Sequence, residues 1–286
     1  MNRDILTYIR ENMSSFSKGQ KRIAAFILDS YDKAAFMTAS KLGQTVNVSE
    51  STVVRFAAEL GYDGYPNMQK SLQKMIRSRL TSVQRIEMAH DQIGDDVVSS
   101  VLRSDVAMIR TTLEELDRGL FNSAVDAILN AKKIYIIGAR SSMSISHFLA
   151  FYFNVIFDNV REISENSASE VFEQILRVGK GDVVIGVSFP RYSSRTVKAM
   201  DYARDRGATV IAITDSEASP IASKAHITLA AKSDMASFVD SLVAPLSLVN
   251  ALIVAVSQKR DQDVARTFHQ LEQIWEEYDV FDKTGN

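Results

Sequence analysis

Residues 38–61 of the chain read TASKLGQTVNVSESTVVRFAAELG, and this stretch decides the fold of the N-terminal region. Apolar residues recur at helical spacing on both sides of a short break at 47–49, which predicts two helices that meet at a tight corner. Asn47 suits the left-handed conformation that ends many helices, and Ser49 suits the N-cap of the next helix. Gly43 costs roughly 1 kcal/mol in a helix relative to alanine. Such a cost is expected where two helix backbones cross closely.

The second predicted helix has an apolar inward stripe and a polar outward face. The stripe consists of Val53, Phe56, Ala57 and Leu60. The outward side, from the N-cap onward, carries Ser49, Glu50, Ser51, Thr52, Val54 and Arg55. Short side chains let a helix approach the DNA major groove, hydroxyls bond phosphates or base edges, and an arginine can form two hydrogen bonds to guanine. With Lys41 as a phosphate contact, these residues other than Val54 are the predicted DNA-binding set.

A small helical hairpin with a solvated face explains the same pattern, so the residues alone leave both interpretations open. The longer stretch VSESTVVRFAAELGYDGYP, residues 48–66, resembles the DNA-binding signature of the RpiR family of bacterial transcription regulators. Members of that family join such a helix-turn-helix to a sugar isomerase (SIS) domain. The resemblance therefore implies double-stranded operator DNA as a partner and an α/β domain farther along the chain.

Charge is divided unevenly along the chain. Residues 1–80 hold 12 lysines and arginines against 7 aspartates and glutamates, whereas the remaining 206 residues hold 21 against 28. The net charge of −2 conceals this division. A basic N-terminal region joined to an acidic body is expected if only the N-terminal region contacts a phosphate backbone.

Composition and spacing exclude several kinds of chemistry. The chain has no cysteine, which excludes disulfides, zinc–thiolate sites and thiol catalysis. Its histidines, at 90, 147, 226 and 269, lack the spacing of metal ligands. The sequence also holds neither a nucleotidase-type phosphate loop nor a nucleophile elbow. We therefore expect no metal and no cofactor.

The sequence also argues against a membrane partner. Its first residues, MNRDILTYIREN, lack an apolar core of signal-peptide length, so we expect the protein in the cytoplasm. The most apolar long segment, 238–257, is interrupted by Asp240, Pro245 and Asn250. This segment is therefore predicted to be a buried helix of the C-terminal domain and not a membrane span.

The chain changes in character after residue 121, where strands begin to alternate with helices. Before that point it reads as helices, among them one that starts with the capping-box pair Ser17 and Gln20 and a long one over 67–89. The predicted domains are an all-helical helix-turn-helix domain at 1–80, a helical connector at 81–119, and an SIS-like domain with C-terminal helices at 120–286.

Five segments of the C-terminal region are predicted strands: 134–138, 160–164, 182–188, 208–214 and 226–231. Their alternation with helices predicts a five-stranded parallel sheet covered on both faces, a three-layer α/β/α fold. Ligands bind such sheets at the carboxyl ends of the strands, beside the point where the strand order reverses. If the order is 2-1-3-4-5, the loops 139–142 and 189–194 flank this crevice.

Both loops are rich in hydroxyl groups and run into helix N-termini. The serines are Ser141, Ser142, Ser193 and Ser194, and three arginines add positive charge, namely Arg140, Arg191 and Arg195. Backbone N–H groups and the helix dipole attract anions at such positions. The alternative is that the serines only cap helices and the arginines face water. Because two clusters converge on one crevice, we expect a site for a phosphate or carboxylate group.

The region 120–258 is similar to an SIS domain. The family pattern G-x-G-x-S is matched by GARSS at 138–142, and the pattern S-x-S-G-x-T by SFPRYS at 188–193. The resemblance implies phosphate-contacting hydroxyls at three serines: Ser142, Ser188 and Ser193.

This chain departs from the SIS pattern at three positions. Two glycines of the pattern are Arg140 and Arg191 here, and the middle serine of the second loop is Pro190. Glycine at those positions lets a phosphate approach the backbone. Either the guanidinium groups take over the recognition of an acidic sugar, or they fill the site.

An aldose–ketose isomerase would need a base of suitable pKa beside such a site. The candidate bases are His147, Glu165, Glu170 and Glu173. A lone histidine beside Phe148 and Phe151 is more typical of a packed or capping residue. We therefore expect no enzymatic activity, and an isomerase with a helical appendage is the alternative.

These observations together predict a sequence-specific transcription regulator controlled by a phosphorylated or acidic sugar. A further alternative is a regulator whose SIS domain only dimerises. One helix pair reads few base pairs, so we expect a homodimer or homotetramer that places two of them on separate half-sites. The segment 238–257 or the C-terminal helix around Trp275 is expected to supply much of the contact.

Overall fold

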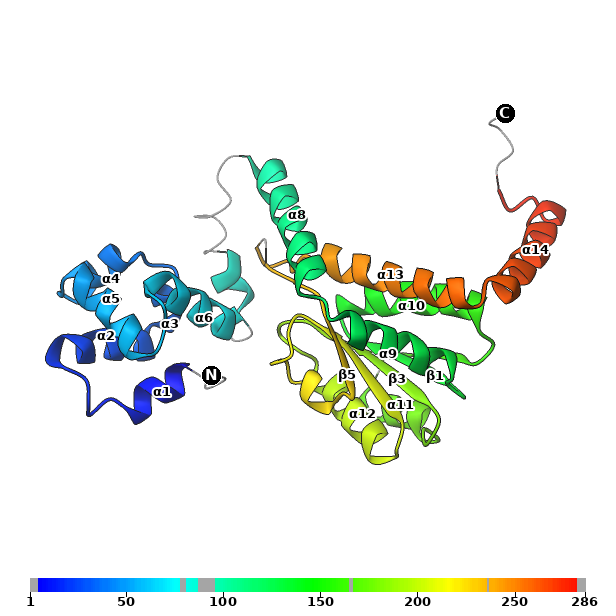
Figure 1. Ribbon diagram of the computed structural model, residues 1–286, viewed down its shortest axis with the longest axis horizontal. Coiled ribbons are helices and arrows are strands. Elements are labelled where there is room, and N and C mark those ends of the chain that lie inside the picture. The colour runs from blue at the N-terminus through cyan, green and yellow to red at the C-terminus, as the bar shows by residue number, and fades with distance from the viewer. Residues whose placement is uncertain (1–4, 78–80, 87–95, 165–166, 236, 282–286) are drawn as a thin grey trace. The chain divides into compact units, whose positions relative to one another are not determined.

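The computed structural model describes residues 5–77, 81–86, 96–164, 167–235 and 237–281. The chain divides into two compact units, residues 1–87 and 88–286 (Figure 1). Helices alone make up the described part of the first unit, and the second contains a five-stranded parallel sheet. The predicted fold class is therefore confirmed.

The first unit consists of α1 (Ile5–Glu11), α2 (Lys18–Asp29), α3 (Tyr31–Ala34), α4 (Ala39–Thr45), α5 (Glu50–Glu59) and α6 (Tyr65–Arg77). Helix α2 begins at the predicted capping box, in which the Ser17 and Gln20 side chains each accept a hydrogen bond from the other residue's amide. The prediction of one long helix over 67–89 is wrong within the described residues. A second capping pair, Thr81 and Gln84, starts a separate helical segment at 82–86.

The core of the first unit lies between the apolar faces of its helices. Its fully buried side chains include Ile9, Ile23, Ile27, Leu42, Phe56 and Leu72. Phe56 meets Phe16 edge to face, with ring centroids 5.2 Å apart. The predicted inward stripe of α5 is buried as expected. Burying each large apolar side chain contributes about 1.5–3 kcal/mol, so this core holds the α4–α5 pair in place.

Helix α6 fixes the segment that precedes α4. The Tyr65 hydroxyl donates to the Met37 carbonyl at 2.7 Å, and Gln69 donates to the same oxygen at 2.8 Å. Gln73 donates to the Ala35 carbonyl at 2.8 Å. Burial raises the pKa of Tyr65 to about 12. These bonds satisfy buried carbonyl groups of a loop that would otherwise lose their water partners.

The second unit alternates helices and strands. In chain order it contains α8 (Val97–Glu115), α9 (Arg118–Leu129), β1 (Ile134–Gly138), α10 (Ser142–Ile156), β2 (Val160–Ile163), α11 (Ala168–Ile175), β3 (Val183–Val187), α12 (Ser194–Asp205), β4 (Thr209–Thr214), η1 (Ala222–Lys224), β5 (Ile227–Ala230), α13 (Val243–Lys259) and α14 (Asp261–Glu277). All strands pair in parallel, as predicted, and their order is β2-β1-β3-β4-β5, the order on which the expected position of the crevice depends.

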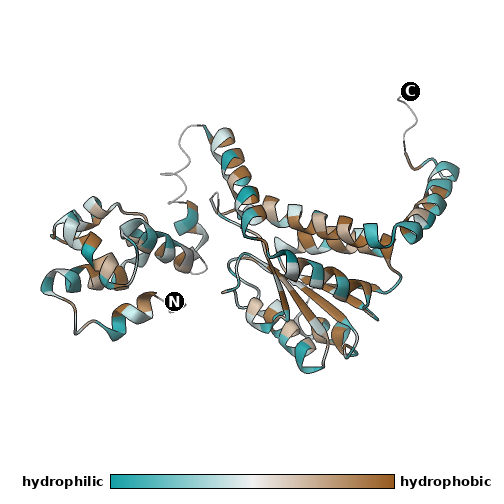
Figure 2. Cartoon of the chain, viewed as in Figure 1, coloured by the Kyte–Doolittle hydropathy of each residue, from teal (hydrophilic) through white to brown (hydrophobic). Residues whose placement is uncertain are grey.

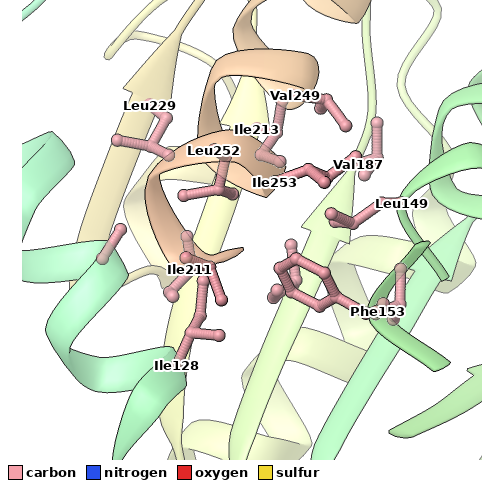
Figure 3. Close-up of a cluster of buried hydrophobic side chains, with 14 of the residues drawn as sticks. Ile128, Leu149, Phe153, Val187, Ile211, Ile213, Leu229, Val249, Leu252 and Ile253 are labelled. Carbon is pink, nitrogen blue, oxygen red and sulfur yellow. The ribbon is translucent and has the colours of Figure 1, made fainter. Parts of the chain in front are cut away.

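Each face of the sheet has its own buried cluster because side chains alternate along a strand. One cluster joins strand residues to α9, α10 and α13, where Ile128, Phe153 and Leu252 are buried (Figure 3). The other joins strand residues to α11 and α12 through Val171 and Met200. Figure 2 shows the strands as the most continuously hydrophobic part of the unit, which is typical of a sheet covered on both faces.

Two helices of this unit bear on the sequence predictions. The apolar segment 238–257 contains α13, whose buried residues face the sheet, as predicted. No helix in the described part of the chain is long and apolar enough to cross a membrane. The region expected as a connector, 81–119, contributes α8 to the second unit. The Lys232 amide donates to the Thr112 hydroxyl of α8 at 2.9 Å.

Candidate functional site

The corner between α4 and α5 has the geometry that the sequence predicts. Asn47 has φ 54°, and the Val48 amide donates to the Gly43 carbonyl at 2.8 Å. A Cβ atom added at Gly43 would lie 2.9 Å from the Val48 carbonyl oxygen. Only glycine fits this approach without displacing the backbone, which explains a helix-breaking residue inside α4.

Hydroxyl groups gather at the N-terminus of α5. Ser49 occupies the N-cap position, yet its side chain makes no capping bond to the helix. Instead its hydroxyl lies 3.0 Å from the Ser51 hydroxyl and 2.8 Å from the Thr52 hydroxyl. The predicted position of Ser49 is confirmed, while the expected capping bond is not formed. The cluster places three hydroxyls where a helix terminus favours phosphate.

Arg55 lies folded against its own helix. Its Nε donates to the Ser51 carbonyl at 3.2 Å and its Nη2 to the Ser51 hydroxyl at 3.4 Å. Arg55, Ser51 and Glu50 are exposed, whereas Thr52 is half-buried. The outward face is therefore accessible, and a bidentate contact with a base requires Arg55 to leave Ser51.

The start of α2 borders this corner, a relation that the sequence does not reveal. Arg22 donates to the Asn47 carbonyl at 3.2 Å. A Cβ atom added at Gly19 would lie 3.3 Å from the Thr52 side chain. Lys18, at the N-terminus of α2, is exposed, as is Lys41 on α4. The sequence alone does not indicate that Lys18 and Arg22 lie near the corner, because only tertiary packing brings α2 beside α5.

In the second unit, β1 and β3 end side by side at the position where the sequence predicts the crevice. Gly138, the last residue of β1, pairs in register with Val187, the last residue of β3. A Cβ atom added at Gly138 would lie 2.6 Å from the Ser146 hydroxyl and 2.8 Å from the Ser142 carbonyl. Glycine here lets α10 begin directly above the strand end.

Two serines of these loops are buried, and a third caps the helix that follows. Ser188 and Ser142 are buried at 2% and 5% exposure. The Ser193 amide donates to the Ser188 hydroxyl at 3.2 Å, and the Ser193 hydroxyl caps α12 by accepting from the Thr196 amide at 3.2 Å. The capping interpretation therefore applies to Ser193.

The remaining loop residues lie at the surface. Ser141, Ser194 and Arg195 are exposed. Ser141 precedes α10 in helical conformation and makes no side-chain capping bond. The structure thus places all the predicted residues at the carboxyl ends of β1 and β3 or at the helices that follow them.

The two arginines that replace pattern glycines both have left-handed backbones. Arg140 has φ 53° and Arg191 has φ 66°. This conformation costs a residue with a Cβ roughly 1–2 kcal/mol. Both residues are exposed. The loops keep a backbone conformation that glycine adopts freely, while each carries a guanidinium group at its exposed turn.

A tyrosine and an aspartate tie the second loop to the next strand. The Tyr192 hydroxyl donates to Asp215 Oδ1 at 2.7 Å, and the Thr214 hydroxyl donates to the same oxygen at 3.2 Å. Burial, with the charge of Asp215 and this hydrogen bond, raises the pKa of Tyr192 far above its ordinary value. Sequence analysis missed this pair, although a Thr-Asp sequence at the end of β4 is a signal for it.

The candidate bases of an isomerase are dispersed. His147 Nδ1 lies 3.0 Å from Glu162 Oε2 on the edge strand β2, and the His147 side chain is 70% exposed. Glu170 is half-buried in the first turn of α11 and Glu173 is exposed. Glu165 lies outside the described residues. Within the described chain, no group of three His, Asp or Glu residues has the arrangement of a metal site.

Protein-family models match both units of the chain. Residues 3–79 match the model of the helix-turn-helix domain of the rpiR family, and residues 127–255 match the SIS domain model. An uncharacterized HTH-type transcriptional regulator of Caldanaerobacter subterraneus is 25% identical over 275 residues, which cover 95% of this chain and 96% of that protein. The HTH-type transcriptional regulator HexR of Escherichia coli is 26% identical over 268 residues, or 90% of this chain and 89% of HexR.

Solved structures show the same fold. The Vibrio vulnificus NanR protein complexed with ManNAc-6P has a TM-score of 0.60 at 22% identity, covering 96% of this chain and 99% of NanR. The sugar isomerase domain of an RpiR transcription factor from Sphaerobacter thermophilus has a TM-score of 0.59 at 24% identity, covering 61% of this chain and 97% of that domain.

Proposed function

By its two domains the chain belongs to the RpiR family of HTH-type transcription regulators, and we propose that its SIS domain binds a phosphorylated or acidic sugar that controls operator binding. In this proposal the helix-turn-helix contacts double-stranded DNA, so the protein works in the cytoplasm. The SIS domain is a sensor and catalyses no reaction.

The observation that carries the proposal is the left-handed conformation of Arg140 and Arg191. Strained backbone persists where a function uses it, and here it occurs at two arginines just before the N-termini of α10 and α12, in the loops that also hold the buried Ser142 and Ser188. A guanidinium binds a phosphate or carboxylate through charge-assisted hydrogen bonds. NanR, which is similar in fold, was solved with a phosphorylated sugar, and this supports the class of ligand.

For the DNA-binding unit, we propose that the N-terminal end of α5 enters the major groove. Ser51 and Arg55 would then face base edges, since both are exposed on that side of the helix. Lys18 and Lys41 would contact phosphates on either side, because α2 and α4 flank the corner. Ser49, Glu50 and Thr52 would border the same contact.

We also propose a homodimer or homotetramer, because one helix pair reads too few base pairs for useful specificity. Helix α14 supports self-association: none of its residues is fully buried in the single chain. Trp275 of α14 contacts Phe268 of the same helix and Phe281, which follows the helix, each edge to face. Light scattering of the full chain at micromolar concentration tests this expectation, and a monomer would contradict it.

A screen of phosphorylated and acidic sugars separates the sensor from its alternatives. Each sugar is added to the full chain while the melting temperature, operator affinity and aldose–ketose turnover are measured. A ligand that binds the folded state raises the melting temperature, and reciprocal coupling changes operator affinity. We expect one sugar to raise the melting temperature and change operator affinity without being converted by the protein.

Two other results would contradict the sensor. Turnover that disappears in His147→Ala would favour an isomerase. If no sugar in a broad panel changed either the melting temperature or operator affinity, an SIS domain kept only for assembly would be favoured.

A further inference from the structure

Helix α8 is attached to its own unit along one side only. On that side Met108 and Thr112 are buried, and Asp105 accepts a hydrogen bond of 2.6 Å from the Ser241 hydroxyl. Lys232 also forms an ion pair with Glu115 at the C-terminal end of the helix. These contacts fix the orientation of α8 on the unit, so the sides of the helix that remain exposed are defined.

The neighbouring side of the helix, next to Asp105, is apolar, although it faces water in the single chain. Leu102, Val106, Ile109 and Leu113 are 58%, 57%, 37% and 60% exposed, and Val98 beside them is 69% exposed. At 100° per residue, these five side chains lie within roughly 80° of the helix circumference. The exposed side of a surface helix is ordinarily polar, and a continuous apolar stripe marks an interface. Figure 2 shows hydrophobic and hydrophilic residues along this helix.

The spacing of the stripe is that of a coiled-coil seam. Leu102, Val106, Ile109 and Leu113 follow one another at intervals of four, three and four residues. In heptad terms they occupy alternating d and a positions. Asp105 then falls at the preceding g position and Arg110 at the following e position. No charged residue interrupts the seam itself.

We propose that α8 pairs in parallel with α8 of a second copy of this chain, and that this pairing sets the separation of the two DNA-binding units. In a parallel pair, each g residue faces the e residue five positions later on the other helix, which places Asp105 opposite Arg110 of the partner. Asp105 lies at the border between the attached side and the stripe, so its Oδ1 can keep the bond from Ser241 while the carboxylate also faces the partner. An antiparallel pair would instead place the two Arg110-bearing edges together. Charge complementarity therefore selects the parallel arrangement.

Chain connectivity agrees with a parallel pair. The chain runs from the DNA-binding unit into the N-terminus of α8. Parallel pairing places both N-termini at the same end, which suits two helix-turn-helix units on half-sites of one operator. The consequence for regulation rests on the proposed function, whereas the pairing itself follows from the exposed stripe and its flanking charges.

Cysteine cross-linking tests the pairing directly, because the chain has no cysteine of its own. Leu102→Cys and Leu113→Cys are prepared separately and oxidised with copper–phenanthroline, which removes two electrons as two thiols join. A parallel pair brings each position beside its own copy, so each variant forms a covalent dimer alone. Ser104→Cys, exposed on another side of α8, stays monomeric on a denaturing gel.

Two outcomes overturn the proposal. If neither variant cross-links, α8 does not pair with its copy. If only a mixture of Leu102→Cys and Leu113→Cys cross-links, the helices pair in the antiparallel direction.

A second pair of variants separates this inference from the sensor. Ile109→Asp places a carboxylate in the seam, so we expect operator affinity to fall by at least about tenfold, while the melting-temperature shift with the sugar is retained. Leu176→Asp, at an exposed apolar residue outside the stripe, should change neither property. Unchanged operator affinity in Ile109→Asp would contradict the role of pairing. Cross-linking without any sugar response would instead overturn the sensor and leave the α8 pair standing.

Discussion

The chain uses left-handed backbone in both of its units, but with different residues. At the α4–α5 corner the left-handed residue is Asn47, a type that tolerates this conformation, and its carbonyl accepts a bond from Arg22. At the ends of β1 and β3 the left-handed residues are Arg140 and Arg191, which do not tolerate it well. The corner therefore follows local sequence preferences, whereas the two loops violate them.

This difference distinguishes a structural turn from a candidate binding site. The corner is stabilised by its own contacts: Gly43 permits the close approach, and the turn closes with a backbone hydrogen bond. The loops of the SIS domain keep a costly conformation with an exposed, charged side chain. Local violations of sequence preference concentrate at functional sites. Five substitutions test the corner and the loops.

The largest effect is expected at the corner. Gly43→Ala should destabilise the first unit by about 1–3 kcal/mol, because the new Cβ would overlap a backbone carbonyl that cannot move without opening the turn. Operator binding should be lost as α5 shifts. Urea unfolding measures the first effect, and Gly179→Ala is the control, since an added Cβ there would lie 3.8 Å from its nearest neighbour. Equal stability of the two variants would show that the corner adapts easily.

At the loop, substitution should affect the ligand more than the fold. Arg191→Ala should lower the affinity for the sugar roughly 10-fold to 150-fold, because it removes one charge-assisted hydrogen bond of about 1.5–3 kcal/mol. Operator binding without sugar should be unchanged. An unshifted sugar titration would remove Arg191 from the site.

Arg191→Gly sharpens the same comparison. Glycine relieves the left-handed strain, so this variant should be more stable than Arg191→Ala by about 1 kcal/mol while binding the sugar equally weakly. If the glycine variant binds as tightly as the parent, the backbone and not the guanidinium recognises the anion.

Arg55 tests whether the exposed face of α5 reads bases. Arg55→Ala should cost about 1–3 kcal/mol of operator affinity and relax preference at one base pair. Lys41→Ala is the matched comparison, because loss of a phosphate contact weakens all sequences alike and flattens the salt dependence. Binding curves on an operator and its single-base variants distinguish them. If Arg55→Ala lowered the affinity for all the DNA sequences equally, Arg55 would contact the DNA phosphate backbone instead of a base.

The smallest effect is expected at Tyr65, which supports the corner from α6. Tyr65→Phe removes the hydrogen bond to Met37 and should cost about 1 kcal/mol at neutral pH. The raised pKa adds a pH dependence: stability from Tyr65 is complete below pH 10 and is lost as the pH rises from 10 towards 12. The free energy of unfolding, measured from pH 10 to pH 12, should therefore fall less steeply for Tyr65→Phe than for the parent.

Local sequence patterns determined much of this protein. The capping pair of α2, the glycine and asparagine of the corner and the five parallel strands could all be predicted, and so could the two serine-rich loops. These features depend on helix and strand periodicity, on capping and on turn chemistry, which act between residues close in the chain. The break in the helix at Thr81 is hidden in the sequence because the apolar period continues across it, and the Thr81–Gln84 capping pair is the local signal of a new helix.

Only the tertiary structure decided which groups meet across the chain. It placed Arg22 against the carbonyl of Asn47 and Tyr192 against Asp215, and it gave Arg140 and Arg191 their left-handed backbones. It also decided which side of α8 packs on the unit and which apolar side stays exposed. An apolar residue in a sequence favours burial without specifying the surface that buries it. That choice depends on the packing of all the elements together.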